Sequence, residues 1–297
     1  MSTTEPRLNH VQCLTARGLH RMAYWEWGDA ANPRVLVCVH GLSRQGRDFD
    51  TLAQTLCDTW RVVCPDVVGR GRSDRLADPA GYQIPTYLAD MVTLLARLNA
   101  SRLDWVGTSM GGLVGMLLAA QKGSPIGRLV LNDVGPKIEF EAVKRIGAYL
   151  GVPQRWASVD EAADYLRSIS PGFGPHTREQ WIALTLPMLV REEGDAGGKG
   201  TSYRSHYDLD IALPFRAITP ESAATGEAVL WHAYDAIACP TLLLRGADSD
   251  LLTRETARAM TERGPKARLH EFAGVGHAPT LVVPEQVDVV RGFLLAA

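Results

Sequence analysis

The chain has 297 residues, a length that suits one large α/β domain with an insert better than two unrelated domains. Hydrophobic residues make up 46% and charged residues 22%, as in an ordinary soluble globular enzyme. The formal charge of −2 gives no electrostatic reason for a nucleic-acid partner or an acidic membrane surface, and we expect neither.

Short apolar runs that recur along the chain predict a parallel sheet. Residues 11–17 and 20–27 first form an expected hairpin around Gly18. Runs of the later type are mostly apolar and β-branched, which suits strands buried on both faces. They lie at 35–39, 62–64, 103–106, 129–131 and 241–244, with a weaker run at 268–272.

Helical periodicity fills the intervals between these runs. Apolar residues recur every three or four positions from Ile84 to Leu98. Similar patterns occupy 113–120 and 287–294, and Thr253 could cap a helix that ends near Arg263. Strand followed by helix, repeated, predicts an α/β fold with a doubly wound, mostly parallel sheet.

Residues 136–233 break this rhythm and contain no clear buried strand. Two capping-box spacings, Ser158-x-x-Glu161 and Thr177-x-x-Gln180, indicate helix starts. Residues 194–200 are glycine-rich, which predicts a mobile loop. We therefore expect a helical cap over 136–233, inserted into a core made of 1–135 and 234–297.

A G-x-S-x-G pentapeptide, Gly107-Thr108-Ser109-Met110-Gly111, carries the strongest chemical signal. It follows a predicted strand and begins a predicted helix, which is the context that gives this motif meaning. Small residues on either side of the serine allow a sharp turn that projects its hydroxyl above the sheet. Ser109 is therefore the predicted nucleophile.

A serine nucleophile needs a base, and the base needs an orienting acid. His277 lies among glycines in a loop after the last predicted strand, and we expect it to be the base. The acid should follow a strand between the serine and the histidine. The run at 241–244 leads to Asp248 and Asp250, and Asp250 is favoured because Leu251-Leu252 could anchor its loop.

The oxyanion of an acyl-transfer reaction needs backbone N–H donors, each contributing about 3 kcal/mol of transition-state stabilisation. His40-Gly41-Leu42 ends the first buried strand, and the N–H groups of Leu42 and Met110 are the predicted donors. His40 is expected to hold this loop rather than to act as the base.

Five segments in order resemble the α/β-hydrolase superfamily over about residues 24–295. The matching segments are VLVCVHGLS, PDVVGRGRSD, WVGTSMGG, RGADSDLL and GVGHAPTLVVPEQ. The resemblance implies Ser109 as nucleophile, His277 as base, and Leu42 and Met110 as oxyanion donors. Its acid position is less regular: many members place it where this chain has Ser249, whereas variants closer to this chain point to Asp250.

The resemblance implies a serine hydrolase that cleaves a carboxylic ester, lactone or hydroxyalkanoate oligomer through an acyl-enzyme. Two alternatives stay open: a C–C bond hydrolase for a diketone-type ring-cleavage product, and a non-catalytic ligand binder on the same fold. No cofactor or metal is expected. Trp181 and Trp231, with Trp156, Phe173 and Met188, could line the substrate pocket, and Arg44 or Arg47 could bind an acidic group of the substrate.

The five cysteines are odd in number and have no CxxC spacing. We therefore expect free thiols in a reducing compartment. The first ten residues lack the apolar core of a secretory signal, and no apolar stretch approaches the roughly 20 residues of a membrane helix. The expected location is the cytoplasm, with the oligomeric state left open.

Overall fold

A computed structural model describes residues 5–193 and 201–296. The predicted loop at 194–200 lies outside these described residues. None of the helices in the two ranges combines the length and apolar character that a bilayer span requires.

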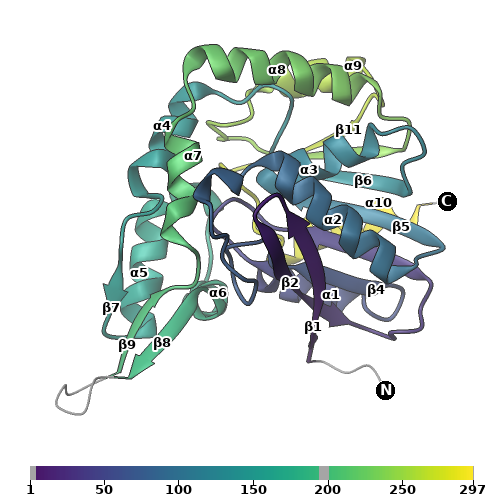
Figure 1. The fold of residues 1–297 in the computed structure, drawn as a ribbon. Helices are drawn as coiled ribbons and strands as arrows, with labels where there is room; N and C mark the ends of the chain where they lie inside the picture. The colour runs from purple at the N-terminus through teal and green to yellow at the C-terminus, as the bar shows by residue number, and fades with distance from the viewer. Residues whose placement is uncertain (1–4, 194–200, 297) are drawn as a thin grey trace.

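The core is one eight-stranded sheet in the order β1-β2-β4-β3-β5-β6-β10-β11 (Figure 1). The hairpin strand β2 pairs antiparallel with both β1 and β4, and every other neighbouring pair is parallel. The predicted doubly wound α/β architecture is thereby confirmed. The strands are β1 (Arg7–Thr15), β2 (Gly18–Trp27), β3 (Arg34–Val39), β4 (Arg61–Pro65), β5 (Arg102–Thr108), β6 (Ile126–Asn132), β10 (Thr241–Gly246) and β11 (Arg268–Phe272).

The apolar runs are continuous because each face of the sheet is covered by helices. In β3, Val35 and Val37 pack toward one cluster, whereas Leu36 and Cys38 pack toward the other. The first cluster includes α2 (Ile84–Leu98), α3 (Met110–Ala119) and α9 (Arg254–Glu262). The second includes α1 (Asp50–Leu56) and α10 (Pro284–Leu295). Alternate residues of each strand thus enter different cores.

Most elements of residues 136–233 lie beside the sheet, on the left of Figure 1, whereas the last helix of this segment runs along the top of the view. Ser158 and Thr177 cap helices as their spacings predict, since each side chain accepts from the backbone N–H three residues on. The helices are α4 (Phe140–Tyr149), α5 (Val159–Ile169), α6 (Arg178–Thr185), α7 (Ala212–Arg216) and α8 (Pro220–Asp235). The division of the chain into core and cap remains a prediction.

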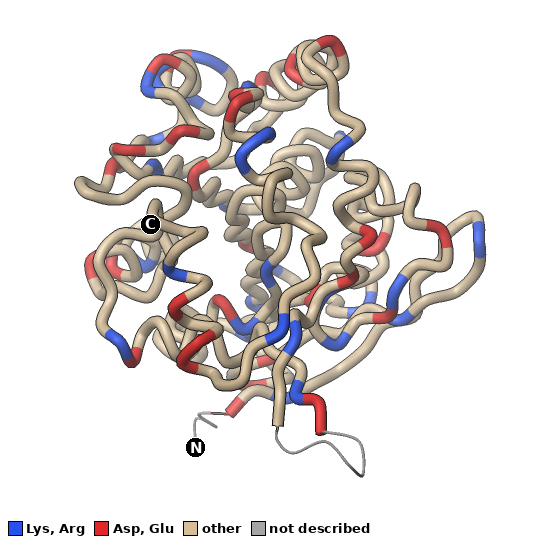
Figure 2. Tube along the Cα trace, turned by 90° about the vertical axis from the view of Figure 1, so that its left-hand side faces the viewer, with Lys and Arg blue, Asp and Glu red and all other residues tan. Residues whose placement is uncertain are grey.

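This segment also holds a small antiparallel sheet that the sequence did not reveal. Its order is β7-β9-β8, with β7 at Arg155–Trp156, β8 at Leu189–Glu193 and β9 at Thr201–Ser205. The strands read LVREE and TSYRS and are only partly buried, so they lack the apolar runs that mark the core strands. Acidic and basic residues are interspersed over the whole trace, in keeping with the small net charge (Figure 2).

Candidate active site

Ser109 lies on a sharp turn between β5 and α3, with backbone angles φ 51° and ψ −116°. A positive φ is strained for a residue with a side chain, and such strain persists only where the surroundings enforce it. A Cβ on Gly107 would lie 2.3 Å from the Gly111 carbonyl oxygen, and one on Gly111 would lie 2.0 Å from that of Val39. Both glycines are therefore required for the turn.

His277 and Ser109, 168 positions apart in the chain, meet as the sequence predicts. The His277 Nε2 and Ser109 Oγ atoms are 3.1 Å apart, within hydrogen-bond distance. His277 lies in the loop between β11 and α10. Asn132 ties this loop to the end of β6 by donating to the Pro279 carbonyl at 2.8 Å. The base thus has a fixed position above the nucleophile.

Asp133, and not Asp250, is the acid that contacts His277. The Asp133 Oδ2 atom lies 2.7 Å from His277 Nδ1, and the carboxylate is fully buried. It also accepts hydrogen bonds from the Gly246 N–H at 2.8 Å and from the Ser249 hydroxyl at 2.6 Å. Three hydrogen-bond donors therefore fix the orientation of the Asp133 carboxylate.

The prediction that Asp250 is the partner of His277 is wrong. Its carboxylate is 49% exposed and forms a two-pronged ion pair with Arg145 of α4, at 2.6 and 2.8 Å. The alternative, Asp248, is also exposed. The loop after β10 still serves the site, because Gly246 and Ser249 donate to Asp133. Asp133 carried a usable signal: it lies two residues after the apolar run at 129–131.

The turn after β3 lies beside the nucleophile. A Cβ on Gly41 would lie 3.7 Å from Ser109 Cβ, and Leu42 lines the same cavity as Ser109. His40 holds the turn from within: its Nδ1 donates to the Gly41 carbonyl at 2.7 Å, and its Nε2 accepts from the Val67 N–H at 3.0 Å. Burial keeps the pKa of His40 far below its usual value, so the ring is neutral.

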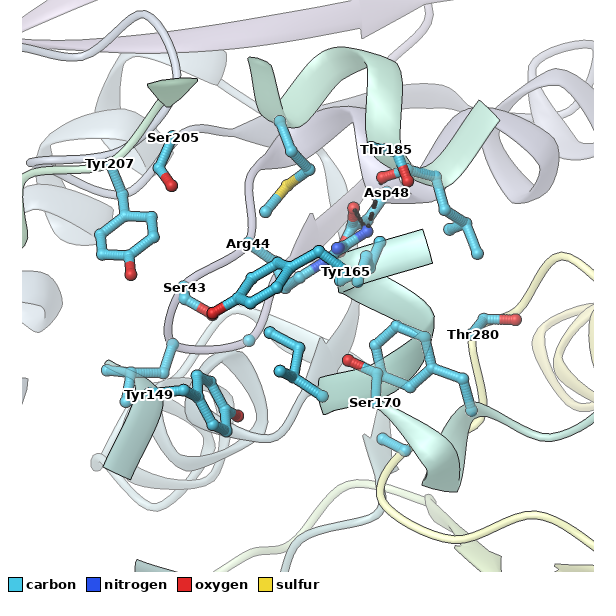
Figure 3. A pocket seen from close by; sticks show the side chains of 18 of the residues that line it. Ser43, Arg44, Asp48, Tyr149, Tyr165, Ser170, Thr185, Ser205, Tyr207 and Thr280 are labelled. Carbon is cyan, nitrogen blue, oxygen red and sulfur yellow. Dashed lines mark hydrogen bonds and ion pairs between the residues drawn. The ribbon is translucent and has the colours of Figure 1, made fainter. Parts of the chain in front are cut away.

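A cavity opens above Ser109 and His277, between the sheet loops and residues 136–233 (Figure 3). Its wall combines aromatic and aliphatic side chains with neutral hydroxyl groups and with three charged side chains, those of Arg44, Asp48 and Arg145. Tyr149 of α4 and Tyr165 of α5 are among the residues that line it. Trp156, Phe173 and Met188 line it as well, as predicted. Most of this surface suits an apolar chain that carries hydrogen-bond acceptors.

The family model described as alpha/beta hydrolase fold matches residues 34–282. The chain belongs to the α/β-hydrolase fold family. It is 55% identical over 99% of its length, and over the whole of the relative, to a 3-hydroxybutyrate-oligomer hydrolase from Cupriavidus necator. An α/β hydrolase from Novosphingobium aromaticivorans superposes with a TM-score of 0.84 at 36% identity, covering 98% of this chain and 99% of the other.

A putative hydrolase from Rickettsia typhi also superposes with a TM-score of 0.85 at 29% identity, covering 97% of this chain and 98% of its own. These relatives confirm the predicted fold and the prediction of a hydrolase.

Two of the predicted pocket residues of this α/β-hydrolase do not line the cavity. Trp181 is buried behind it and stacks on Phe173, with ring centroids 6.0 Å apart. Trp231 lies on α8, where its ring packs against Tyr234 and beneath the Arg263 guanidinium. Both tryptophans serve packing instead. The sequence identifies large apolar residues but not which face of a short helix turns toward a cavity.

One buried group of potential metal ligands occurs among the described residues of this α/β-hydrolase, and none of its members lines the cavity. Cys13, His20 and Asp90 bring their ligand atoms within 4.8 Å of one another, between the β1-β2 hairpin and α2. His20 Nε2 and Asp90 Oδ2 are 3.0 Å apart. Burial and the nearby Asp90 raise the pKa of Cys13 to about 12, which keeps the thiol protonated. The group therefore links the hairpin to α2 through hydrogen bonds.

Proposed function

We propose that this α/β-hydrolase cleaves the ester bonds of 3-hydroxybutyrate oligomers through an acyl-enzyme on Ser109. The single observation that carries the reaction type is the Ser109–His277–Asp133 chain at the base of the cavity. The substrate class rests on the relative from Cupriavidus necator, whose similarity extends over both chains.

The contacts support a role for each group. His277 Nε2 takes the proton of Ser109 as the hydroxyl attacks the ester carbonyl, and Asp133 stabilises the imidazolium through the Nδ1 hydrogen bond. The N–H groups of Leu42 and Met110 stabilise the oxyanion. His277 then protonates the departing alcohol and activates the water that hydrolyses the acyl-enzyme.

The cavity suits a short polyester. Each 3-hydroxybutyrate unit carries an apolar methyl branch and an ester carbonyl that accepts a hydrogen bond. Met188 and Phe173 offer apolar contact, and the Tyr149 and Tyr165 hydroxyls are neutral donors on the same wall. Polar groups of this kind set orientation, while the apolar wall supplies most of the contact.

Cys13, Cys38, Cys64 and Cys239 are free thiols among the described residues. Free thiols are typical of proteins kept in a reducing compartment. We therefore propose that the enzyme acts in the cytoplasm on a small-molecule substrate.

Substrate turnover by the native protein and by Ser109→Ala tests the proposal. The panel contains the dimer and trimer of (R)-3-hydroxybutyrate, a p-nitrophenyl butyrate ester and a ring-cleavage diketone. We expect rapid release of 3-hydroxybutyrate, measured by chromatography, and a loss of at least about 10³-fold in kcat for the Ser109→Ala variant. Faster cleavage of the diketone than of the oligomers would instead identify a C–C bond hydrolase. Unchanged oligomer turnover by Ser109→Ala would refute the acyl-enzyme.

A further inference from the structure

Arg44 is a buried cation with an unused donor in the wall of the cavity. Its side chain pairs with Asp48, with Nε–Oδ2 and Nη2–Oδ1 distances of 2.6 Å, and Nη2 also donates to the Leu184 carbonyl at 3.0 Å. Arg44 is 9% exposed and lines the cavity. Its Nη1 atom is buried and has no hydrogen-bond partner in the part of the chain that the structure describes. A buried guanidinium N–H without a hydrogen-bond acceptor costs free energy, and a bound ligand that accepts this hydrogen bond would remove the cost.

Arg47, three residues along, shows the contrasting case. It also forms a bidentate ion pair, with Asp50 at 2.6 to 2.9 Å. Its side chain is 28% exposed, its guanidinium lies over the Trp25 ring, and it is not among the residues that line the cavity. Of the two arginines that the sequence offered for an acidic group, only Arg44 lies at the site.

Arg44 begins next to the nucleophile. A Cβ placed on Gly41 would lie 3.7 Å from Ser109 Cβ and 3.8 Å from Arg44 Cγ, so the two side chains flank one glycine. The Phe173 ring covers the guanidinium, with 5.7 Å between Arg44 Cζ and the ring centroid. Figure 3 shows Arg44 and Asp48 paired inside the cavity, with Tyr165 in front of them in this view. A covered cation of this kind favours a carboxylate, since little water competes for it.

We propose that Arg44 binds the free carboxylate of the oligomer, so that the enzyme removes single units from the carboxyl end. This inference rests on the proposed function, since it concerns the orientation of that substrate. One hydroxybutyrate unit separates the last ester carbonyl from the terminal carboxylate. With that carbonyl at Ser109, we expect the carboxylate to lie toward Arg44, whose side chain flanks Gly41 together with that of Ser109.

The reaction then releases the carboxyl-terminal unit first. The Ser109 Oγ atom first forms a bond to the ester carbonyl carbon, which gives the oxyanion, and the bond between that carbon and the alkoxy oxygen breaks when the oxyanion collapses. The departing alkoxide takes the proton that His277 received from Ser109 and leaves as 3-hydroxybutyrate, with its carboxylate still intact. The remainder of the oligomer stays on Ser109 as an acyl group until water releases it.

Asp48 opposes this binding and provides an independent test. Its carboxylate shares the guanidinium, and burial raises its pKa even though Arg44 acts in the opposite direction. A second carboxylate beside Arg44 is repelled by Asp48. Asp48→Asn keeps a hydrogen-bond acceptor and removes that charge, so a role for Arg44 in carboxylate binding predicts a gain where a purely structural role predicts none.

The experiment compares kcat/KM for the 3-hydroxybutyrate dimer as free acid and as methyl ester. We expect the native enzyme to favour the free acid by at least about tenfold, the ratio expected for one charge-assisted hydrogen bond. In Arg44→Met the ratio falls to about one, and in Asp48→Asn it rises. The matched variant Arg47→Met keeps the native ratio. A trimer labelled in its carboxyl-terminal unit yields labelled monomer as its first product.

Several outcomes overturn the inference. The inference fails if the native enzyme cleaves the free acid and the methyl ester with about equal kcat/KM. It also fails if Arg44→Met keeps the preference of the native enzyme for the free acid. If the preference for the free acid is lost in Arg145→Met and not in Arg44→Met, the carboxylate binds Arg145 of α4, which also lines the cavity. If Arg44→Met does not fold, by circular dichroism, the absence of any rise in Asp48→Asn counts against the proposal. Failure to cleave either form of the dimer, with p-nitrophenyl butyrate still cleaved, would instead refute the proposed function.

Discussion

The loops at the carboxyl edge of the sheet and the segment 136–233 build opposite walls of one cavity by different means. The sheet side fixes its groups through backbone contacts that tolerate no added atom, as at Gly111, and through a carboxylate with three donors, Asp133. The opposite side uses short helices with few buried residues; α4 buries only Ala142, and α5 only Ala162 and Ala163. The chemistry is therefore held rigidly, whereas the pocket wall can change side chains at little cost to the fold.

Among the variants that test this comparison, Asp133→Asn is expected to have the largest effect on activity. The amide cannot hold His277 in the required tautomer, and we expect kcat for ester hydrolysis to fall about 10⁴-fold while the fold is kept. Asp250→Asn is the matched control on the neighbouring strand end, and we expect it to change kcat less than about threefold, because an exposed ion pair contributes only about 0–1 kcal/mol. Steady-state kinetics on both variants decide the matter, and a larger loss in Asp250→Asn would restore it as the acid.

A pair of glycines tests the rigidity of the two regions. In Gly111→Ala the new Cβ would meet the Val39 carbonyl at 2.0 Å, so we expect a loss of about 1–3 kcal/mol in the free energy of unfolding together with a large loss of activity. Gly226→Ala lies in α8 of the segment 136–233, where nothing approaches within 4 Å. Its expected effect is a gain of up to about 1 kcal/mol from helix propensity.

Denaturant unfolding of both glycine variants gives the measurement, with ester turnover alongside. Equal, small changes at the two positions would show that the turn around Ser109 can relax, contrary to the contacts described.

The acid is the part of the site that sequence patterns placed wrongly, and the reason is geometric. Chain order puts the serine, the acid and the histidine on different strand ends, and β6 and β10 are hydrogen-bonded neighbours that end at the same edge. Either strand could supply the acid. Which of them lies under His277 depends on the path of a distant loop, which the tie between Asn132 and Pro279 sets. Local sequence patterns cannot predict that long-range contact.

Patterns succeeded where the local sequence decides the outcome. Ser109 sits in a turn that its flanking glycines enforce, and the core strands follow from apolar runs buried on both faces. They failed where partial burial hides the pattern, as in β8 and β9. The cavity wall was half predicted, because Phe173 and Trp181 stack on one another and only one of them faces the cavity.

The smallest expected effect concerns His206, which joins the two regions. It follows β9, its Nδ1 accepts from the Gly71 N–H at 2.8 Å, and its Nε2 lies 3.2 Å from the Ser43 carbonyl. Burial, with Arg44 nearby, lowers the pKa of His206 to about 3 from its usual 6.5. Between about pH 3 and pH 6.5, the unfolded chain therefore binds a proton on His206 that the folded protein does not bind. The contribution of His206 is complete above pH 6.5 and falls as the pH drops toward 3.

We expect His206→Asn to flatten the pH dependence of the unfolding free energy between pH 4 and 6.5, with little change in its slope above pH 7. Asn keeps an acceptor for Gly71 and a donor for Ser43 but does not titrate. Urea unfolding at a series of pH values measures the slope, and His232→Asn, at an exposed position of α8, serves as the control. An identical slope in His206→Asn and the native protein would mean that His206 is protonated in the folded state, and that the contact between the two regions is looser than these hydrogen bonds imply.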